Sequence, residues 1–176
     1  LLAGLADKFF PSSRRYLEIG CGTGVVLRAG SGAPARVCVL RIDGGPAASM
    51  DVDNLRHGFL PIAMGKGPLV ALGGGPERLP VLWNSETGAM TPLKGHVGDM
   101  TAIAFSHDGT RVATGGNDRT IRLFEVDANG GVRQSDVERH HQDSVLTLRF
   151  APNDATLLST SVDGTIRLWS TAVERP

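Results

Sequence analysis

Short apolar runs alternate with polar turn sequences along the second half of the chain. Residues 102–105 form an apolar run, and residues 106–109 (Ser-His-Asp-Gly) have the composition of a turn. Further runs at 111–114 and 120–126 follow, separated by a turn sequence at 115–118. Runs of this length bounded by Gly, Asp, Asn and Ser are typical of β-strands. The pattern predicts three consecutive strands joined by tight turns.

The same order of runs and turns returns near the end of the chain without a gap. Several residue types recur at a fixed offset of 45 positions (141 − 96), namely His96 and His141, Phe105 and Phe150, Asp118 and Asp163, and the segments 120–123 and 165–168. A period of about 40–45 residues is typical of propeller blades built from four short strands. The repeat therefore predicts an all-β fold.

Particular residues of the repeat correspond to a known motif. They are the Gly-His pair at Gly95-His96, the turn aspartates Asp118 and Asp163, and Trp169 near the end of a third strand. In these positions the chain resembles the WD40 family. The resemblance implies an all-β, WD40-type β-propeller fragment of three to four four-stranded blades, with antiparallel strands in each blade.

The resemblance also implies a hydrogen-bond network in each blade. A histidine from the incoming loop would bond a small hydroxyl and a turn carboxylate, and the buried polar groups would satisfy one another. The expected members are His141, Ser159, Asp163 and Trp169 in the last blade, and His96, Thr114 and Asp118 in the blade before it. Phe124 replaces the Trp in that earlier blade, which removes the indole N–H donor and predicts an incomplete network.

A catalytic Ser-His-Asp arrangement uses the same residue types and is the alternative interpretation of this network. Repeated copies favour a repeated structural role, and the chain has no G-x-S-x-G sequence of a nucleophile elbow. We therefore predict no catalytic residues.

The pattern extends weakly toward the N-terminus. Residues 62–74 align on 103–116 with one deletion, and Trp83 supplies a third-strand aromatic. His57-Gly58 is a degenerate equivalent of the Gly-His pair, and Glu77 lies near the turn-aspartate position. The predicted division is 1–53, a lead-in (a short helix or another ordered segment) and a degenerate blade; 54–94, a divergent WD40 blade; 95–139, a WD40 blade; and 140–176, a WD40 blade that ends after its third strand. Residues 44–54 and 127–139 are predicted linkers, the second with a hairpin or loop at Asn129-Gly130-Gly131.

Residues 16–24 (Tyr-Leu-Glu-Ile-Gly-Cys-Gly-Thr-Gly) compete with the propeller interpretation. They resemble the first motif of S-adenosylmethionine-dependent methyltransferases, and Asp43 follows at a distance suited to a ribose contact. That fold needs a helix between the two strands, whereas residues 28–34 contain the helix breakers Gly and Pro. The favoured interpretation is a degenerate blade in which Gly20 takes the place of Gly115.

Composition narrows the classes of partner. Lys+Arg 18 and Asp+Glu 18 balance, so no general attraction to nucleic acid or to an anionic membrane is predicted. No apolar run approaches the roughly 20 residues of a membrane span. Cys21 and Cys38 make neither a disulfide framework nor a zinc site, and His140-His141 lack a third ligand at a suitable spacing. We expect no metal, no cofactor, and a cytoplasmic location with the nucleus as the alternative.

The expected function is a non-catalytic scaffold that presents a protein- or peptide-interaction surface. The resemblance places the candidate partner contacts just before a first strand or a turn aspartate, at Asp99, Asn117, Ser144 and Val162. Arg122 and Arg167 are equivalent positions, predicted to share a solvated strand face.

A second alternative function comes from residues 113–118, which look similar to guanine-nucleotide exchange propellers of vesicle trafficking. A closed ring of about seven blades needs roughly 300 residues, so further blades or self-association are expected.

Overall fold

The computed structural model describes residues 14–20, 23–29, 35–41, 48–52, 61–73, 79–138 and 141–171. These residues form β-strands joined by turns and contain no helix, so the predicted all-β class is confirmed for them. The chain divides into two compact units, residues 1–59 with 76–78 and residues 60–75 with 79–176. The predicted helix at the N-terminus, His57-Gly58 and Glu77 lie outside the described residues.

The first unit contains one four-stranded antiparallel sheet whose strand order follows the chain. Its strands are β1 (Arg14–Gly20), β2 (Thr23–Ala29), β3 (Ala35–Arg41) and β4 (Ala48–Val52). Two details of the prediction are wrong here. Gly20 ends the first strand of this sheet rather than taking the second-strand place of Gly115, and part of the predicted linker 44–54 is a strand, β4.

The same sheet contradicts the methyltransferase alternative. β1 and β2 are antiparallel, with Gly20 opposite Thr23, and β2 and β3 are antiparallel as well. A nucleotide-binding strand–turn–helix unit needs parallel strands joined by a helix, and here β2 occupies the place of that helix. Asp43 lies outside the described residues.

The second unit contains three sheets of antiparallel strands, each ordered along the chain. The first has β5 (Ile62–Met64), β6 (Leu69–Leu72), β7 (Val81–Asn84) and β8 (Met90–Pro92). The second has β9 (Met100–Phe105), β10 (Arg111–Gly116), β11 (Ile121–Val126) and β12 (Val132–Glu138). The third has β13 (Val145–Phe150), β14 (Thr156–Ser161) and β15 (Ile166–Ser170).

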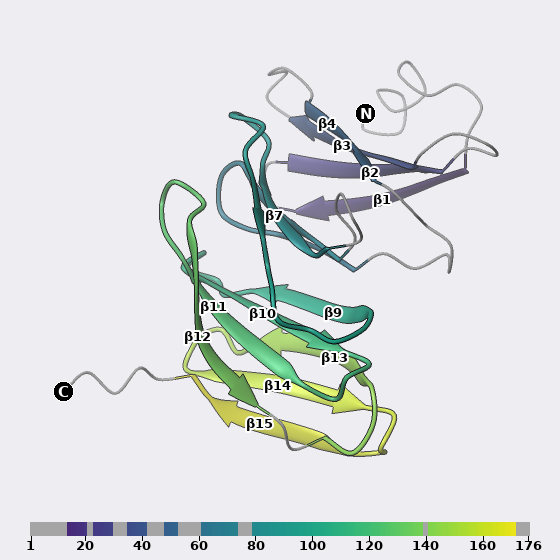
Figure 1. The fold of residues 1–176 in the computed structure, drawn as a ribbon. Helices are drawn as coiled ribbons and strands as arrows, with labels where there is room; N and C mark the ends of the chain where they lie inside the picture. The colour runs from purple at the N-terminus through teal and green to yellow at the C-terminus, as the bar shows by residue number, and fades with distance from the viewer. Residues whose placement is uncertain are drawn as a thin grey trace. The chain divides into compact units, whose positions relative to one another are not determined.

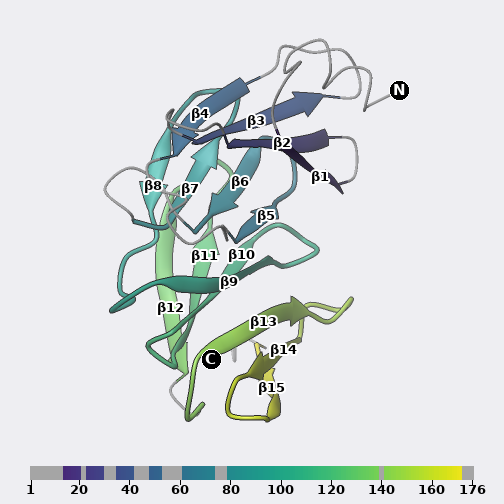
Figure 2. The same ribbon diagram turned by 90° about the vertical axis from the view of Figure 1, so that its right-hand side faces the viewer.

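The β9–β12 sheet lies between the other two sheets of this unit (Figure 1, Figure 2). Alternate residues of a strand point to opposite faces, and here both faces are covered. One apolar cluster joins it to the β13–β15 sheet and contains Ala102, Ala113, Ile121, Leu123, Val145, Leu148, Phe150 and Leu157. The other joins it to the β5–β8 sheet and contains Leu69, Ala71, Leu82, Leu93, Val112, Phe124 and Val126. The central sheet is therefore the core of the unit.

Most of the predicted linker at residues 127–139 is a strand, β12. It pairs antiparallel with β11 after a turn at Asp127–Gly131, so the hairpin at Asn129-Gly130-Gly131 is confirmed while the linker beyond it is wrong. Residues 133–136 (Arg-Gln-Ser-Asp) are exposed. An outer strand that buries little surface carries no apolar run, which is why its sequence does not resemble a strand.

A carboxylate clamp fastens the β13–β15 sheet to the β9–β12 sheet. Asp154, in the turn before β14, is 7% exposed and has a φ of 55°. Its carboxylate accepts hydrogen bonds from the His107 backbone N–H (2.7 Å), His107 Nδ1 (3.0 Å) and the Asp108 N–H (2.8 Å). The Arg111 guanidinium donates to the Asp154 carbonyl and lies over the Phe150 ring, 5.6 Å from its centroid. The clamp connects turns that are 46 or 47 positions apart in the sequence.

We expect Asp154→Asn to lower the free energy of unfolding by about 1–3 kcal/mol at neutral pH, because an amide accepts these bonds less strongly and adds an unsatisfied donor. Burial raises the pKa of Asp154, but the hydrogen bonds from His107 and Asp108 outweigh it and hold the pKa below its ordinary value. The stabilisation is therefore complete above pH about 4 and is lost as the pH falls through the folded-state pKa.

Chemical denaturation of both proteins from pH 7 down to pH 3 measures this effect. The difference between wild type and Asp154→Asn should shrink below pH about 4. Asp136→Asn, at an exposed position on β12, is the matched control and should change little. A difference that stays constant with pH would contradict the clamp.

Candidate functional site

The last sheet holds the more complete of the two predicted networks. His141 Nδ1 lies 2.9 Å from Asp163 Oδ2, and His141 Nε2 lies 2.7 Å from Ser159 Oγ. The Trp169 Nε1–H donates to the same Ser159 oxygen at 2.8 Å, and its ring meets the His141 ring edge-on at 6.0 Å. A carboxylate can only accept, so Nδ1 carries the proton toward Asp163 and Nε2 accepts from the Ser159 hydroxyl. The structure brings all four predicted residues together.

The β9–β12 sheet holds the second network. His96 Nδ1 lies 3.0 Å from both carboxylate oxygens of Asp118, and Nε2 lies 2.8 Å from Thr114 Oγ1. Phe124 lies opposite Val112, as Trp169 lies opposite Leu157, and is 2% exposed in the apolar cluster toward β5–β8. Its ring offers no donor to Thr114. This network therefore has three members where the other has four.

The surroundings of both networks shift the pKa of several members. Burial lowers the pKa of His96, which keeps its ring neutral. Burial raises the pKa of Asp118, but hydrogen bonds from the Val97 N–H, Thr120 and His96 outweigh it and lower the pKa. The Thr165 hydroxyl is the largest cause of the lowered pKa of Asp163. Both aspartates are therefore ionised acceptors at neutral pH.

The hydroxyl of the Ser-His-Asp set is closed off from solvent. Ser159 and Thr114 are both 0% exposed, and the His141 side chain is 1% exposed. A nucleophile must reach the substrate carbonyl, and its base must reach the same atoms. The arrangement orders the end of each sheet and gives a substrate no access to the hydroxyl.

The four predicted contact residues form two equivalent pairs at the ends of these sheets. The Asn117 N–H donates to the Asp99 carbonyl at 3.0 Å, and the Val162 N–H donates to the Ser144 carbonyl at 3.0 Å. Asp99 and Asn117 are exposed, Val162 is 55% exposed, and Ser144 is partly buried. Each pair joins the segment before a first strand to the turn after a second strand.

Comparison with known proteins identifies the repeat. The family model of the WD domain, G-beta repeat, matches residues 89–125 and 133–170. This is a WD40-repeat chain. Each matched repeat starts with the outer strand of one sheet, β8 or β12, and ends with the third strand of the next, β11 or β15. Each WD40 repeat therefore links two neighbouring blades covalently.

Known relatives are WD-repeat proteins. The chain is 34% identical over 93 residues to protein tipD of Dictyostelium discoideum, covering 49% of this chain and 15% of that protein. It is 31% identical over 128 residues to the ribosome biogenesis protein WDR12 homolog of Arabidopsis thaliana, covering 67% and 30%. It is 34% identical over 91 residues to target of rapamycin complex subunit wat1 of Schizosaccharomyces pombe, covering 50% and 28%. The chain spans less than a third of each of these relatives.

Two further properties concern the part of the WD40 chain that the structure describes. None of its elements is a helix with the length and apolarity needed to cross a bilayer. The His, Cys, Asp and Glu side chains in the same residues form no group of three or more suited to a metal ion.

Beside the network of the β9–β12 sheet the structure places a cavity that sequence reasoning missed. Its volume is about 660 Å³. The lining residues are Val97, Asn117, Asp118, Arg119, Thr120, Arg122, His141 and Gln142. They come from the loop before β9, the β10–β11 hairpin and the loop before β13. Of the predicted contacts, only Asn117 lines this cavity.

Arg122 is buried, whereas the sequence predicted that it lies on a solvated strand face. Its side chain is 8% exposed and lies on the face of β11 that also carries Phe124, where an exposed arginine was expected. Gly95 is the sequence feature that could have indicated this burial. A Cβ built on Gly95 would lie 2.6 Å from an Arg122 guanidinium nitrogen, so the glycine leaves room for the buried cation.

Proposed function

We propose that this WD40 chain is a non-catalytic scaffold that binds a protein or peptide at the turn-bearing ends of its blades. The observation that carries this is a repeated backbone pairing, Asp99 with Asn117 and Ser144 with Val162, on turns held by buried networks. All of these residues except the partly buried Ser144 are exposed. Binding residues held on loops by a rigid framework are a common arrangement in proteins. One relative is named as a complex subunit, which supports a role in assembly.

The outward face of the β13–β15 sheet supports a second contact of the same scaffold. Ile166 and Leu168 are 70% and 69% exposed, whereas Ile121 and Leu123, at equivalent positions of the preceding repeat, are 1% and 6% exposed. Those two residues pack against the next blade. The equivalent face of β15 therefore suits another blade, supplied by further residues or by a second copy.

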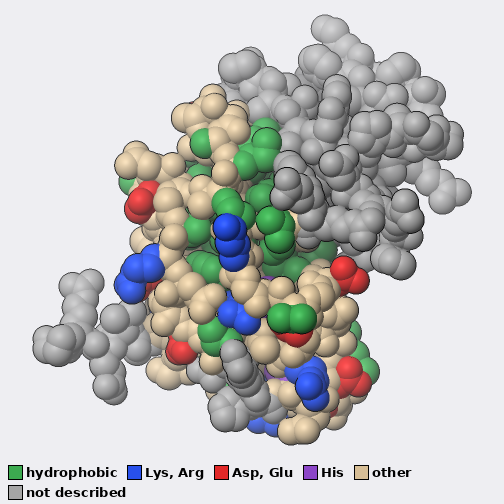
Figure 3. All heavy atoms as spheres, viewed as in Figure 1, with side chains coloured by type: hydrophobic (Ala, Val, Ile, Leu, Met, Phe, Trp, Pro, Cys, Tyr) green, Lys and Arg blue, Asp and Glu red, His purple; other side chains and the backbone are tan. Residues whose placement is uncertain are grey.

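The charge balance supports a protein partner, and the cysteine content supports the proposed location. Figure 3 shows basic and acidic side chains interspersed on one face of the described residues. With balanced charge, a protein partner is favoured over a nucleic acid. Two cysteines outside any disulfide framework favour a reducing compartment, so the proposed location is the cytoplasm or the nucleus.

A variant carrying Asn117→Arg and Val162→Arg tests the turn surface. Both side chains are exposed, so we expect an unchanged unfolding midpoint and at least about tenfold weaker partner binding, equivalent to ~1.4 kcal/mol. Wild type and variant serve as baits, and captured proteins are quantified by mass spectrometry. Asn129→Arg with Asn153→Arg, at exposed turns of other hairpins, is the matched control. Equal capture by all three baits would contradict the proposed surface.

A further inference from the structure

Arg122 is a buried cation with few partners. Its side chain, 8% exposed, makes one hydrogen bond, from Nη1 to Gln134 Oε1 at 3.1 Å, and its Nε is buried without an acceptor. No carboxylate among the described residues forms an ion pair with it. Burying a guanidinium is costly unless an anion and hydrogen-bond acceptors compensate it. The positive charge of Arg122 is therefore not compensated by any anion among the described residues.

The neighbouring backbone is shaped to hold this guanidinium in place. Gly95 has a φ of 127°, which other residues rarely adopt, and a Cβ there would lie 2.6 Å from Arg122 Nη1 and 2.8 Å from Cζ. The guanidinium thus lies directly against the Gly95 backbone. Its position is fixed before any ligand arrives, which reduces the entropy lost on binding.

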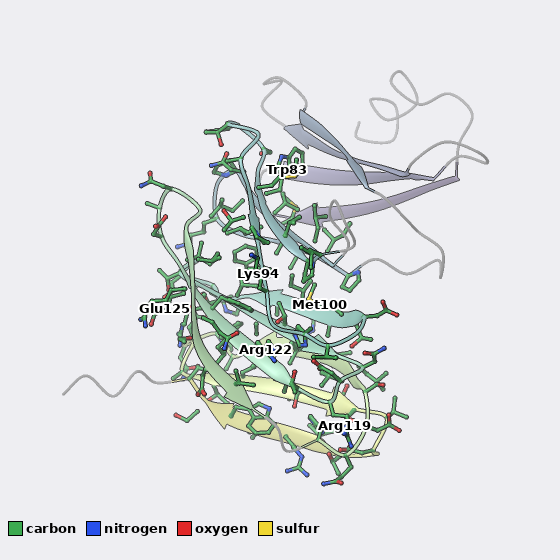
Figure 4. The ribbon with its side chains drawn as sticks, in the orientation of Figure 1. Trp83, Lys94, Met100, Arg119, Arg122 and Glu125 are labelled. Carbon is green, nitrogen blue, oxygen red and sulfur yellow. The ribbon has the colours of Figure 1, made fainter. Side chains whose placement is uncertain are left out.

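Arg122 lines the 660 Å³ cavity together with a second arginine. Arg119, in the β10–β11 turn, is exposed, has a φ of 68° and forms no ion pair among the described residues. Figure 4 labels both arginines on this hairpin, Arg122 on β11 and Arg119 at its turn. The cavity volume falls within the range of small-molecule and cofactor pockets, about 300–1,000 Å³.

Asp118 is the one carboxylate among the described residues that line the cavity, and it does not neutralise these cations. The Asp118 oxygens already accept hydrogen bonds from His96 Nδ1, the Val97 N–H and the Thr120 N–H and hydroxyl. Two guanidinium groups against one engaged carboxylate give the described lining residues a net positive charge. Guanidinium groups bind carboxylate and phosphate oxygens through paired N–H donors.

We propose that this cavity binds an oxyanion, a carboxylate or a phosphate, carried by the polypeptide partner of the scaffold. The proposal rests on the proposed function and names the chemistry of the partner group. Arg122 supplies the buried charge, and Arg119 binds the group from the β10–β11 turn. The next blade has no equivalent pair: Arg167 also has a buried Nε without an acceptor, but Gly164 stands at the position of Arg119.

Inorganic phosphate is the first probe, titrated into the full chain at constant ionic strength. The Nε–Hε resonances of Arg122 and Arg119 are followed by NMR and are expected to shift in a saturable way. Arg119→Gln should weaken the phosphate affinity about tenfold, as expected for the loss of one charge-assisted hydrogen bond. Arg149→Gln, at an exposed position on β13, is the matched control and should leave the affinity unchanged. Resonances that do not move, or equal affinities in the two variants, would overturn the site.

Three peptides of one sequence distinguish the source of the oxyanion, with Glu, phosphoserine or Gln at one position. The Glu peptide, the phosphoserine peptide, or both should bind at least tenfold more tightly than the Gln peptide, and Arg122→Lys, which keeps the charge but loses the paired donors, should reduce that preference. Equal binding of all three peptides would overturn the oxyanion site. If the Asn117→Arg, Val162→Arg variant nevertheless lost partner capture, the scaffold proposal would stand and only the oxyanion site would be rejected.

Discussion

Leu157→Ala is expected to lower the free energy of unfolding by about 2–5 kcal/mol, one of the two largest effects that we predict. Leu157 is 0% exposed and belongs to the cluster that joins the β9–β12 and β13–β15 sheets. Truncation removes apolar contact and leaves a cavity between two sheets that relax only in part. Urea denaturation, with the midpoint and slope fitted separately, measures the change.

The neighbouring residue provides a control of the same chemical type. Leu158 lies on the opposite face of β14 and is only partly buried. Leu158→Ala should therefore cost less than Leu157→Ala, about 1 kcal/mol or below for a site near the surface. Similar losses at both positions would mean that the outward face of the β13–β15 sheet is also buried in solution, against a second copy or further residues.

Ser159→Ala is expected to lower the free energy of unfolding by about 2–4 kcal/mol, although it deletes a single oxygen atom. Ser159 is 0% exposed, donates to His141 Nε2 and accepts from Trp169 Nε1. The substitution removes the hydroxyl to which both rings bond, and the loss of a buried hydrogen-bond partner costs about 1–3 kcal/mol per group. The same denaturation experiment measures it.

Thr114→Val is the matched variant in the other network, because Thr114 bonds one ring, that of His96, and has no Trp beside it. It should cost about half as much as Ser159→Ala. A double-mutant cycle between Ser159→Ala and Asp163→Asn tests the coupling, since both residues hold His141. Effects that add within about 0.5 kcal/mol would show that Ser159 and Asp163 act independently and would contradict a coupled network.

Local sequence signals determined most of the blade pattern. The offset of 45 positions located β9–β11 and β13–β15, because apolar alternation and turn chemistry are properties of neighbouring residues. The network residues could be named for a similar reason. A histidine and an aspartate that recur at the same places in two copies carry a repeated role that one sequence can reveal. Asn129-Gly130-Gly131 likewise marked a hairpin through the positive φ that glycine accepts.

Strands without an apolar run were missed. β12 is polar because it is the outer strand of its sheet, and β4 lies in a stretch interpreted as a linker. Residues 16–24 carried a strong glycine pattern in common with another family, yet β1 and β2 form an antiparallel hairpin. Strand pairing is a non-local property, so a local motif cannot distinguish a hairpin turn from a cofactor loop.

The sequence by itself determined the all-β class, the repeat and the chemistry of each blade. Only the tertiary structure decided which surfaces meet. The Asp154 clamp joins turns 46 or 47 positions apart, and the burial of Arg122 depends on the approach of the Gly95 backbone. Ile121 is buried and Ile166 is exposed within the same Thr-Ile-Arg-Leu sequence. Burial and charge compensation depend on distances between segments that are remote in the chain, and those distances are set by folding rather than by local sequence.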